Sequence, residues 1–191
     1  MPRAKPLPDD RPPPPETEPA SELSAAVPWL ALGVGLQVLL AVLLLTAPAA
    51  VTGHRPGARW ALAASALWQL GISAGFAPGL LHGRPGAWAA ITGMVVVRAA
   101  GWTVEVAASL LAVGRAGLSP NEVAFYFAGI LLTAAVPALL TGLFGAALLR
   151  NRDLFRIPGE PAAELLRHGG WSLLVTAALE ALRLWLSLGA R

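Results

Sequence analysis

The 191-residue chain is 55% apolar and only 13% charged, whereas ordinary soluble domains carry roughly 25% charged residues. No residue from 23 to 53 is formally charged, and this run exceeds the roughly 20 apolar residues that cross a bilayer as a helix. These features exclude an ordinary soluble enzyme. They predict an all-α fold, a polytopic membrane helix bundle with about five transmembrane helices.

The positive charge of the chain does not indicate nucleic-acid binding. The net charge is +3, but the 14 basic residues are scattered in short connections between apolar runs. Such residues act as topology signals and contact anionic lipid head groups. Cysteine is absent, which excludes disulfides, thiolate zinc sites and cysteine-ligated iron–sulfur clusters. The expected partner is the lipid bilayer, with no nucleic acid, no cofactor and no metal.

The first 23 residues differ from the rest of the chain. They are rich in proline, including Pro12 to Pro15, and have little apolar surface to bury, so we expect a disordered cytoplasmic tail over 1–23. A docking segment for an aromatic groove is the alternative. The apolar run that follows is longer than a cleaved signal sequence, which favours an uncleaved anchor. Residues 24–191 then form the transmembrane helical domain.

The predicted spans, in chain order, cover residues 24–51, 60–81, 85–113, 119–149 and 170–190. The clearest helix start is Ser119-Pro120-Asn121-Glu122, where an N-cap serine, a proline at the first helical position and a glutamate two residues later form a capping box. Pro137 lies inside the fourth span and removes a backbone hydrogen bond there. Between the last two spans, residues 161–168 are expected to form a short interfacial helix.

Orientation follows from the basic residues of the short connections. With the N-terminus in the cytoplasm, the inner side holds Arg3, Lys5, Arg11, Arg84, Arg150, Arg152, Arg156 and Arg167, and the outer side Arg55, Arg59, Arg115 and Arg191. This excess predicts a cytoplasmic N-terminus. Arginine supplies all but one of the basic residues, a usage associated with GC-rich bacterial genomes, so the expected location is a bacterial inner membrane.

Tryptophan supports the span boundaries independently of hydropathy. Trp29, Trp60, Trp88 and Trp171 each fall near the start of a predicted span. The indole ring combines an apolar body with a polar N–H group, which suits the head-group region of a bilayer. We therefore expect all four side chains to lie at a membrane interface.

Besides Glu122 in the first turn of the fourth span, four charged residues lie inside predicted spans: Arg98, Glu105, Glu180 and Arg183. A charge at the centre of a transmembrane helix costs about 2.5–3.5 kcal/mol on insertion scales, so each should face inward and find a partner. The third and fifth spans run in the same direction. Arg98 and Glu180 then lie at similar depths and should pair, and Arg183 can extend toward Glu105.

This intramembrane charge cluster has two interpretations. Its balanced charge favours a structural clasp that fixes helix pairing or joins a partner subunit. Ionisable residues within membranes often form substrate, ion or proton sites, and this is the alternative interpretation. The sequence has no hydrolase, zinc-protease or phosphate-loop motif, so we expect no enzyme and no catalytic residues.

A stripe of glycines, Gly71, Gly75 and Gly79, recurs every four residues in the second span. Small residues at this spacing allow a neighbouring helix to approach closely, so the stripe is expected to pack against a helix of this chain or of another. The leading hypothesis is a non-catalytic membrane subunit or scaffold, homo-oligomeric or bound to another membrane subunit. The alternative is a small transporter or channel component that uses the charge cluster.

Overall fold

The computed structural model describes residues 19–46, 56–157 and 159–188, whose regular structure is entirely helical. The helices are α1 (Pro19–Thr46), α3 (Pro56–Leu81), α4 (Pro85–Arg115), α5 (Pro120–Ile130), α6 (Val136–Arg150) and α7 (Pro161–Leu188). A π-helical segment, Leu131–Ala135, joins α5 to α6, and a 3-10 turn, Arg152–Phe155, follows α6. Because α5, the π segment and α6 are continuous, five long helices are described, and the all-α prediction is confirmed for this part of the chain.

Several helix boundaries differ from those expected. α1 begins at Pro19, inside the predicted tail of residues 1–23. Residues 1–18 of that tail and 47–51 of the first predicted span lie outside the described residues. α3 begins at Pro56, four residues early, and α7 begins at Pro161. The expected helices 161–168 and 170–190 are thus one element.

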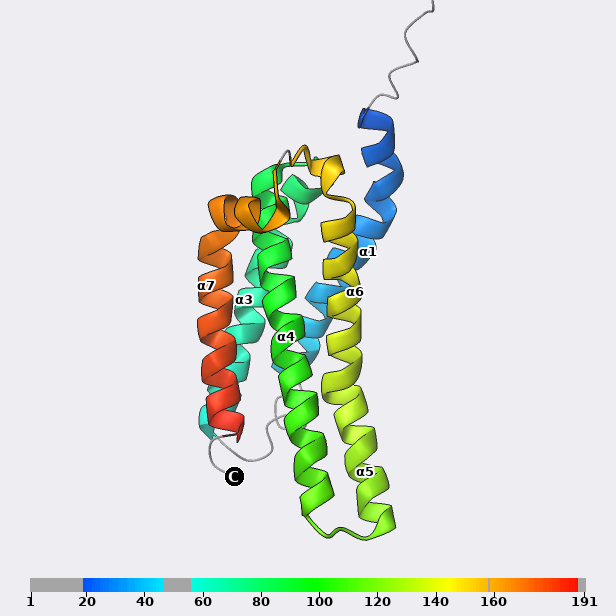
Figure 1. The fold of residues 1–191 in the computed structure, drawn as a ribbon, viewed down its shortest axis with the longest axis vertical. Helices are drawn as coiled ribbons and strands as arrows, with labels where there is room; N and C mark the ends of the chain where they lie inside the picture. Colours follow the sequence, from blue (N-terminus) through cyan, green and yellow to red (C-terminus); the bar gives the residue numbers. More distant parts are fainter. Residues whose placement is uncertain (1–18, 47–55, 158, 189–191) are drawn as a thin grey trace, which may run out of the picture.

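The first turns of α7 lie crosswise at one end of the bundle before the helix bends and runs beside α4 (Figure 1). Gly169 and Gly170 are two adjacent residues without side chains, which permits such a bend within a continuous helix. The first turns of α7 are thus placed as expected of an interfacial helix. They remain part of one continuous helix with the rest of α7.

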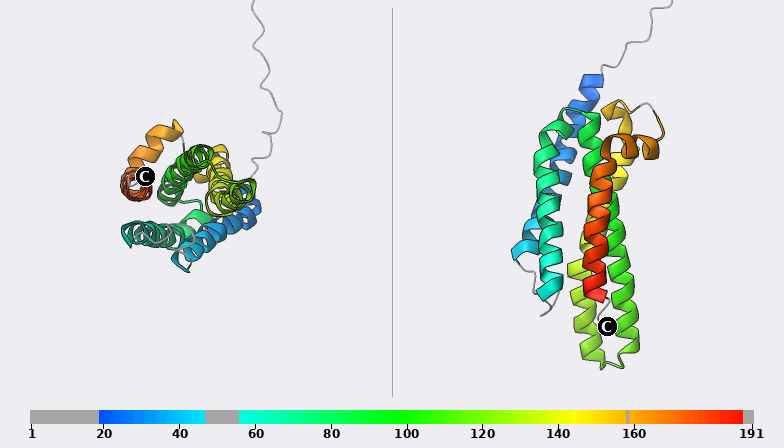
Figure 2. Two further views of the ribbon diagram at one scale, coloured as in Figure 1. Left: turned by 90° about the horizontal axis from the view of Figure 1, so that it is seen from below. Right: turned by 90° about the vertical axis from the view of Figure 1, so that its left-hand side faces the viewer.

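The five long helices run alternately up and down the bundle, so α4 and α7 point in the same direction (Figure 1). Viewed end-on, α4 lies between α6 and α7 in one layer, and α1 and α3 form a second layer (Figure 2). α4 contacts α3, α6 and α7. Its inner face is therefore where residues from several helices meet.

Four helical segments are long and apolar enough to cross a membrane: Glu22–Thr46, Arg59–Leu81, Pro85–Arg115 and Pro120–Arg150. The outer surface carries large apolar side chains, such as Leu32, Leu132 and Leu174, while buried positions include Gln37 and Gln69. This distribution, apolar outside and partly polar inside, suits a multi-pass protein surrounded by lipid. α7 is not among the four segments.

Proline shapes the helix formed by α5 and α6. Pro137 has no N–H group, so the carbonyl of Thr133 loses its usual partner four residues later. The π segment lies directly before this position, and a π turn redirects hydrogen bonds to residues one position further along. The Thr133 hydroxyl donates to the Gly129 carbonyl at 2.8 Å. The expected disturbance is therefore a local change of helix type within a continuous helix.

The predicted interfacial position is wrong for Trp88 and stays a prediction for the other three tryptophans. Trp60 is 79% exposed and Trp171 is 46% exposed, but Trp88 is fully buried. Its indole N–H donates to the Leu148 carbonyl at 2.9 Å, and its ring centroid lies 6.3 Å from that of Phe155. The turn after α6 thus covers Trp88, which removes it from the interface.

Candidate functional site

The four charged residues expected inside the membrane meet between α3, α4 and α7. Arg98 and Glu105 lie on α4, and Glu180 and Arg183 lie on α7. Spacings of seven and three residues place each pair on one helix face. α4 and α7 are parallel neighbours (Figure 2), and ion pairs between Arg98 and Glu180 and between Arg183 and Glu105 join these two faces.

Arg98 joins all three helices. One terminal nitrogen, Nη1, lies 2.5 Å from Glu180 Oε1 on α7 and also donates to the hydroxyl of Ser65 on α3. The Ser65 hydroxyl in turn donates to Glu180 Oε1 at 2.7 Å. The side chains of Arg98 and Glu180 are 0% and 4% exposed. This pairing is thus a buried, hydrogen-bonded contact that links α3, α4 and α7.

Arg183 holds both carboxylates of the cluster. Its Nε donates to Glu180 Oε2 at 2.9 Å, and its Nη1 pairs with Glu105 Oε2. The Glu105 side chain is 12% exposed, the most accessible member of the cluster. Two guanidinium groups and two carboxylates give a formal charge of zero. The order of contacts along the network is Arg98, Glu180, Arg183 and Glu105.

Trp102 packs against both guanidinium groups. The Cζ atom of Arg183 lies 4.4 Å from the centroid of the ring, and that of Arg98 lies 5.6 Å from it. A cation within about 6 Å of an indole face is attracted by its negative π surface. Trp102 and Ser65 were not among the residues predicted for the site. The spacing of Trp102, four residues after Arg98, was the available signal.

Gly101 makes room for the carboxylate of Glu180. A Cβ atom built at Gly101 would lie 2.6 Å from Glu180 Oε2, closer than real Cβ contacts. Any side chain at this position would therefore displace the carboxylate of Glu180 from its place beside α4. Gly101 thus makes space for the Glu180 side chain, and nothing in the sequence pattern singled it out.

The guanidinium of Arg98 keeps two donors free. Its Nε and Nη2 atoms are buried, and neither has a hydrogen-bond partner among the described residues. Buried polar groups are nearly always hydrogen-bonded in folded proteins. Pairing within the cluster therefore satisfies its charges but not all of its donors.

The glycine stripe is divided between two environments. A Cβ atom at Gly79 would lie 2.8 Å from the Cβ atom of Ala87, where α3 meets α4. At Gly71 and Gly75, a Cβ atom would meet nothing within 4 Å, and both residues are exposed. Within the described part of this chain, the stripe therefore packs at Gly79 alone. Packing of Gly71 and Gly75 against a helix of another chain stays a prediction.

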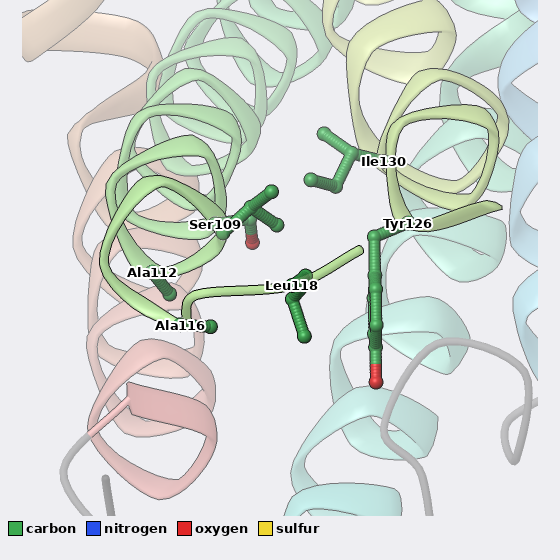
Figure 3. A pocket seen from close by; sticks show the side chains of 7 residues that line it. Ser109, Ala112, Ala116, Leu118, Tyr126 and Ile130 are labelled. Atoms are coloured by element: carbon green, nitrogen blue, oxygen red, sulfur yellow. The ribbon is translucent and has the colours of Figure 1, made fainter. Parts of the chain in front are cut away.

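A separate apolar groove lies between α4 and α5, where this hairpin projects beyond the ends of α3 and α7 (Figure 2). The groove has a volume of about 290 Å³. Figure 3 shows that the Tyr126 hydroxyl points away from Ser109, so these two polar side chains do not converge. The other lining residues are apolar: Ala112, Val113, Ala116, Leu118 and Ile130. The groove therefore presents apolar surface and no set of reactive groups.

In the described part of the chain, no group of three or more histidine, cysteine or carboxylate side chains is placed to hold a metal ion. His82, directly after α3, bonds to the carbonyl of Pro78 in that helix, and His168 lies 3.2 Å from Glu164. His54 lies outside the described residues. Comparison with protein families, with curated proteins and with solved structures finds no match to this chain.

Proposed function

We propose that this protein is a non-catalytic integral membrane subunit or scaffold of a bacterial inner membrane. The observation that carries the proposal is the closed charge cluster: each carboxylate of Glu105 and Glu180 is bonded by a guanidinium of the same chain. In this proposal the buried pairing specifies which helices associate. The cluster then serves as a clasp that holds α7 against α3 and α4.

The partner surface in this proposal is the open face of α3. Gly71 and Gly75 expose backbone that a second helix can approach closely, and membrane helices associate through van der Waals contact at such positions. The second helix belongs to another copy of this chain or to a different membrane subunit.

Replacing Gly75 by leucine tests this surface. Leucine fits without a clash inside the monomer, and it is a better helix former than glycine by about 1 kcal/mol, so folded yield should be retained. Assembly should be lost because the leucine side chain separates the two helices. The measurement is co-purification of two differently tagged copies from membranes, with quantitative mass spectrometry of any stoichiometric partner.

Gly35→Leu is the matched control, because Gly35 is also an exposed helical glycine with nothing within 4 Å of its Cβ position. It lies on α1 and should leave assembly unchanged. If Gly75→Leu retains the same partners as the control and the unmodified chain, the stripe faces lipid and the proposed partner surface is wrong.

The proposal also makes α7 a fifth span, with the N-terminus in the cytoplasm. Glu180 and Arg183 lower its hydropathy, but both are buried against α4. The rest of α7 runs beside two of the candidate spans (Figure 1). A reporter fused after Arg152 should therefore report the cytoplasm, and one fused at the C-terminus should report the outer side. Two fusions that report the same side would show that α7 does not cross.

A small transporter or channel component is the second candidate. The unpaired Nε and Nη2 donors of Arg98 and the partial exposure of Glu105 favour it, because a polar substrate or proton needs free groups and a route to them. The test is substrate or proton flux into liposomes that contain the protein. Flux that depends on pH or voltage and disappears in the Glu105→Gln variant would support this candidate over the scaffold.

A further inference from the structure

Arg156 follows the 3-10 turn after α6 and has a left-handed backbone conformation, with φ 54° and ψ 45°. It is the one non-glycine residue with a positive φ among the described residues. Its neighbours Phe155 and Ile157 are buried in the core, whereas Arg156 itself is exposed. Glycine adopts this conformation without the steric cost that a Cβ atom adds, so packing does not explain an arginine here. Strained residues of this kind are often found where the side chain has a function.

A second turn of the chain lies against the one that carries Arg156. A Cβ atom at Gly83, between α3 and α4, would lie 3.2 Å from the backbone carbonyl oxygen of Leu154. Arg84 directly follows Gly83 in the sequence, and Arg152 and Arg156 lie two residues before and after Leu154. The three arginines therefore come from two turns that touch one another.

These turns carry more positive charge than the carboxylates beside them neutralise. Arg84 and Arg156 are exposed, and neither forms an ion pair with another described residue. Arg152 lies 3.8 Å from Asp153, which is 90% exposed, and such surface pairs are weak. α1 contacts the 3-10 turn and brings one further carboxylate. Four arginines against two carboxylates leave a net charge of +2: Arg84, Arg150, Arg152 and Arg156 against Glu22 and Asp153.

The position of the two turns indicates a membrane interface. They lie at the same end of the bundle as the crosswise first turns of α7 (Figure 1). The candidate spans in α3 and α4 are joined there, so in a bilayer this end lies among the lipid head groups. Leu166 in the crosswise turns is 67% exposed. Apolar side chains beside positive charge are typical of segments that bind an anionic membrane surface.

The chemistry of the two turns favours a phosphate group as the ligand. Arginine side chains bind phosphate oxygens through paired, charge-assisted hydrogen bonds, and phospholipids present phosphate at this depth. We propose that Arg84, Arg152 and Arg156 bind the head group of an anionic phospholipid. The inference requires that the chain lies in a bilayer, but it is independent of the scaffold function and of which side is cytoplasmic.

Native mass spectrometry of the full chain in a neutral detergent, titrated with phosphatidylglycerol or phosphatidylcholine, tests this site. Arg156→Gly removes the guanidinium and leaves a residue that favours the observed backbone, so its stability to heating without added lipid should be equal or higher. The unmodified chain should bind phosphatidylglycerol more tightly than phosphatidylcholine. Arg156→Gly should bind phosphatidylglycerol about fivefold more weakly, the contribution of one arginine near an anionic surface. Arg84→Gln, on the other turn, should weaken it similarly.

Arg115→Gly is the matched control, because it removes the same charge from an exposed arginine at the far end of α4. Its affinity for phosphatidylglycerol should equal that of the unmodified chain. The proposal is overturned if the unmodified chain does not prefer phosphatidylglycerol, or if either Arg156→Gly or Arg84→Gln binds it as tightly as the control does. Displacement of the lipid by an equal concentration of inorganic phosphate would indicate a soluble ligand instead. A loss of heat stability in Arg156→Gly would show that the arginine is needed for packing, which also contradicts the proposal.

Discussion

Arg98→Leu is expected to destabilise the fold by about 3–5 kcal/mol, the usual cost of removing one partner of a buried ion pair. The substitution leaves Glu180 and Glu105 with a single guanidinium, that of Arg183, and gives the buried cluster a net negative charge. It also removes the hydrogen bond from α4 to Ser65 on α3. Both losses act on the contact between the same three helices.

The measurement is the fraction of monodisperse protein left after heating in detergent, followed by fluorescence-detected size exclusion. Arg115→Leu is the control because Arg115 lies exposed at the end of α4, where substitutions usually change stability by less than about 0.5 kcal/mol. If heating removes the same fraction of monodisperse protein in both variants, the Arg98 contacts do not stabilise the fold more than an exposed arginine does.

Gly169→Ala is expected to have the second large effect. A Cβ atom at Gly169 would lie 2.5 Å from the backbone carbonyl oxygen of Ala89 on α4. Neither backbone can yield locally, so α7 must move away from α4. Overpacking costs about 1–3 kcal/mol in typical cores and sometimes more. Here the displacement would also stretch the hydrogen bond from Ser172 to the Ala90 carbonyl, which measures 2.8 Å.

The adjacent glycine provides the control for this experiment. A Cβ atom at Gly170 would meet nothing within 4 Å. Gly170→Ala should therefore be neutral or stabilising, since alanine favours a helix over glycine by about 1 kcal/mol. The same heating assay measures both variants. If Gly169→Ala and Gly170→Ala have the same thermal stability, α7 does not approach α4 closely at Gly169.

The arrangement of the charge cluster could be predicted from the sequence because membrane topology restricts which residues can meet. Successive spans alternate in direction, so the third and fifth predicted spans are parallel and residue counts along them give depth. Arg98 and Glu180 are paired in the structure as that counting predicts. The same argument predicts the pair Arg183 and Glu105. The two residues lie at different depths along their helices, and the long arginine side chain spans that difference.

The residues that complete the cluster could not be predicted from span direction and depth. Ser65 and Trp102 are ordinary members of apolar helices, and helices with apolar residues all round give little indication of which face is buried. Gly101 and Gly169 matter only because another helix approaches them, which is a tertiary property. Trp88 is a residue whose predicted environment was wrong. Tryptophan is common at membrane interfaces, but the turn after α6 covers this side chain.

Helix ends were predicted unequally well for a physical reason. His82, Gly83 and Arg84 separate α3 from α4 as expected, and Gly83 adopts a positive φ of 69° that favours glycine. The expected helices 161–168 and 170–190 left a gap at Gly169, but glycine can still form helical hydrogen bonds. α7 therefore continues through this position and only bends. Sequence alone does not separate these two uses of glycine.

Completing the double-mutant cycle tests most directly whether the cluster is a structural clasp. Arg98→Leu combined with Glu180→Leu leaves Arg183 and Glu105 as a neutral pair, and well-packed apolar residues can replace a buried ion pair at little loss. The double variant should recover most of the stability lost by either single variant, with a coupling energy near the upper end of the range of about 0.5–3 kcal/mol seen for contacting residues. It should also keep its assembly partners. A double variant no more stable than the worse single one would contradict the account.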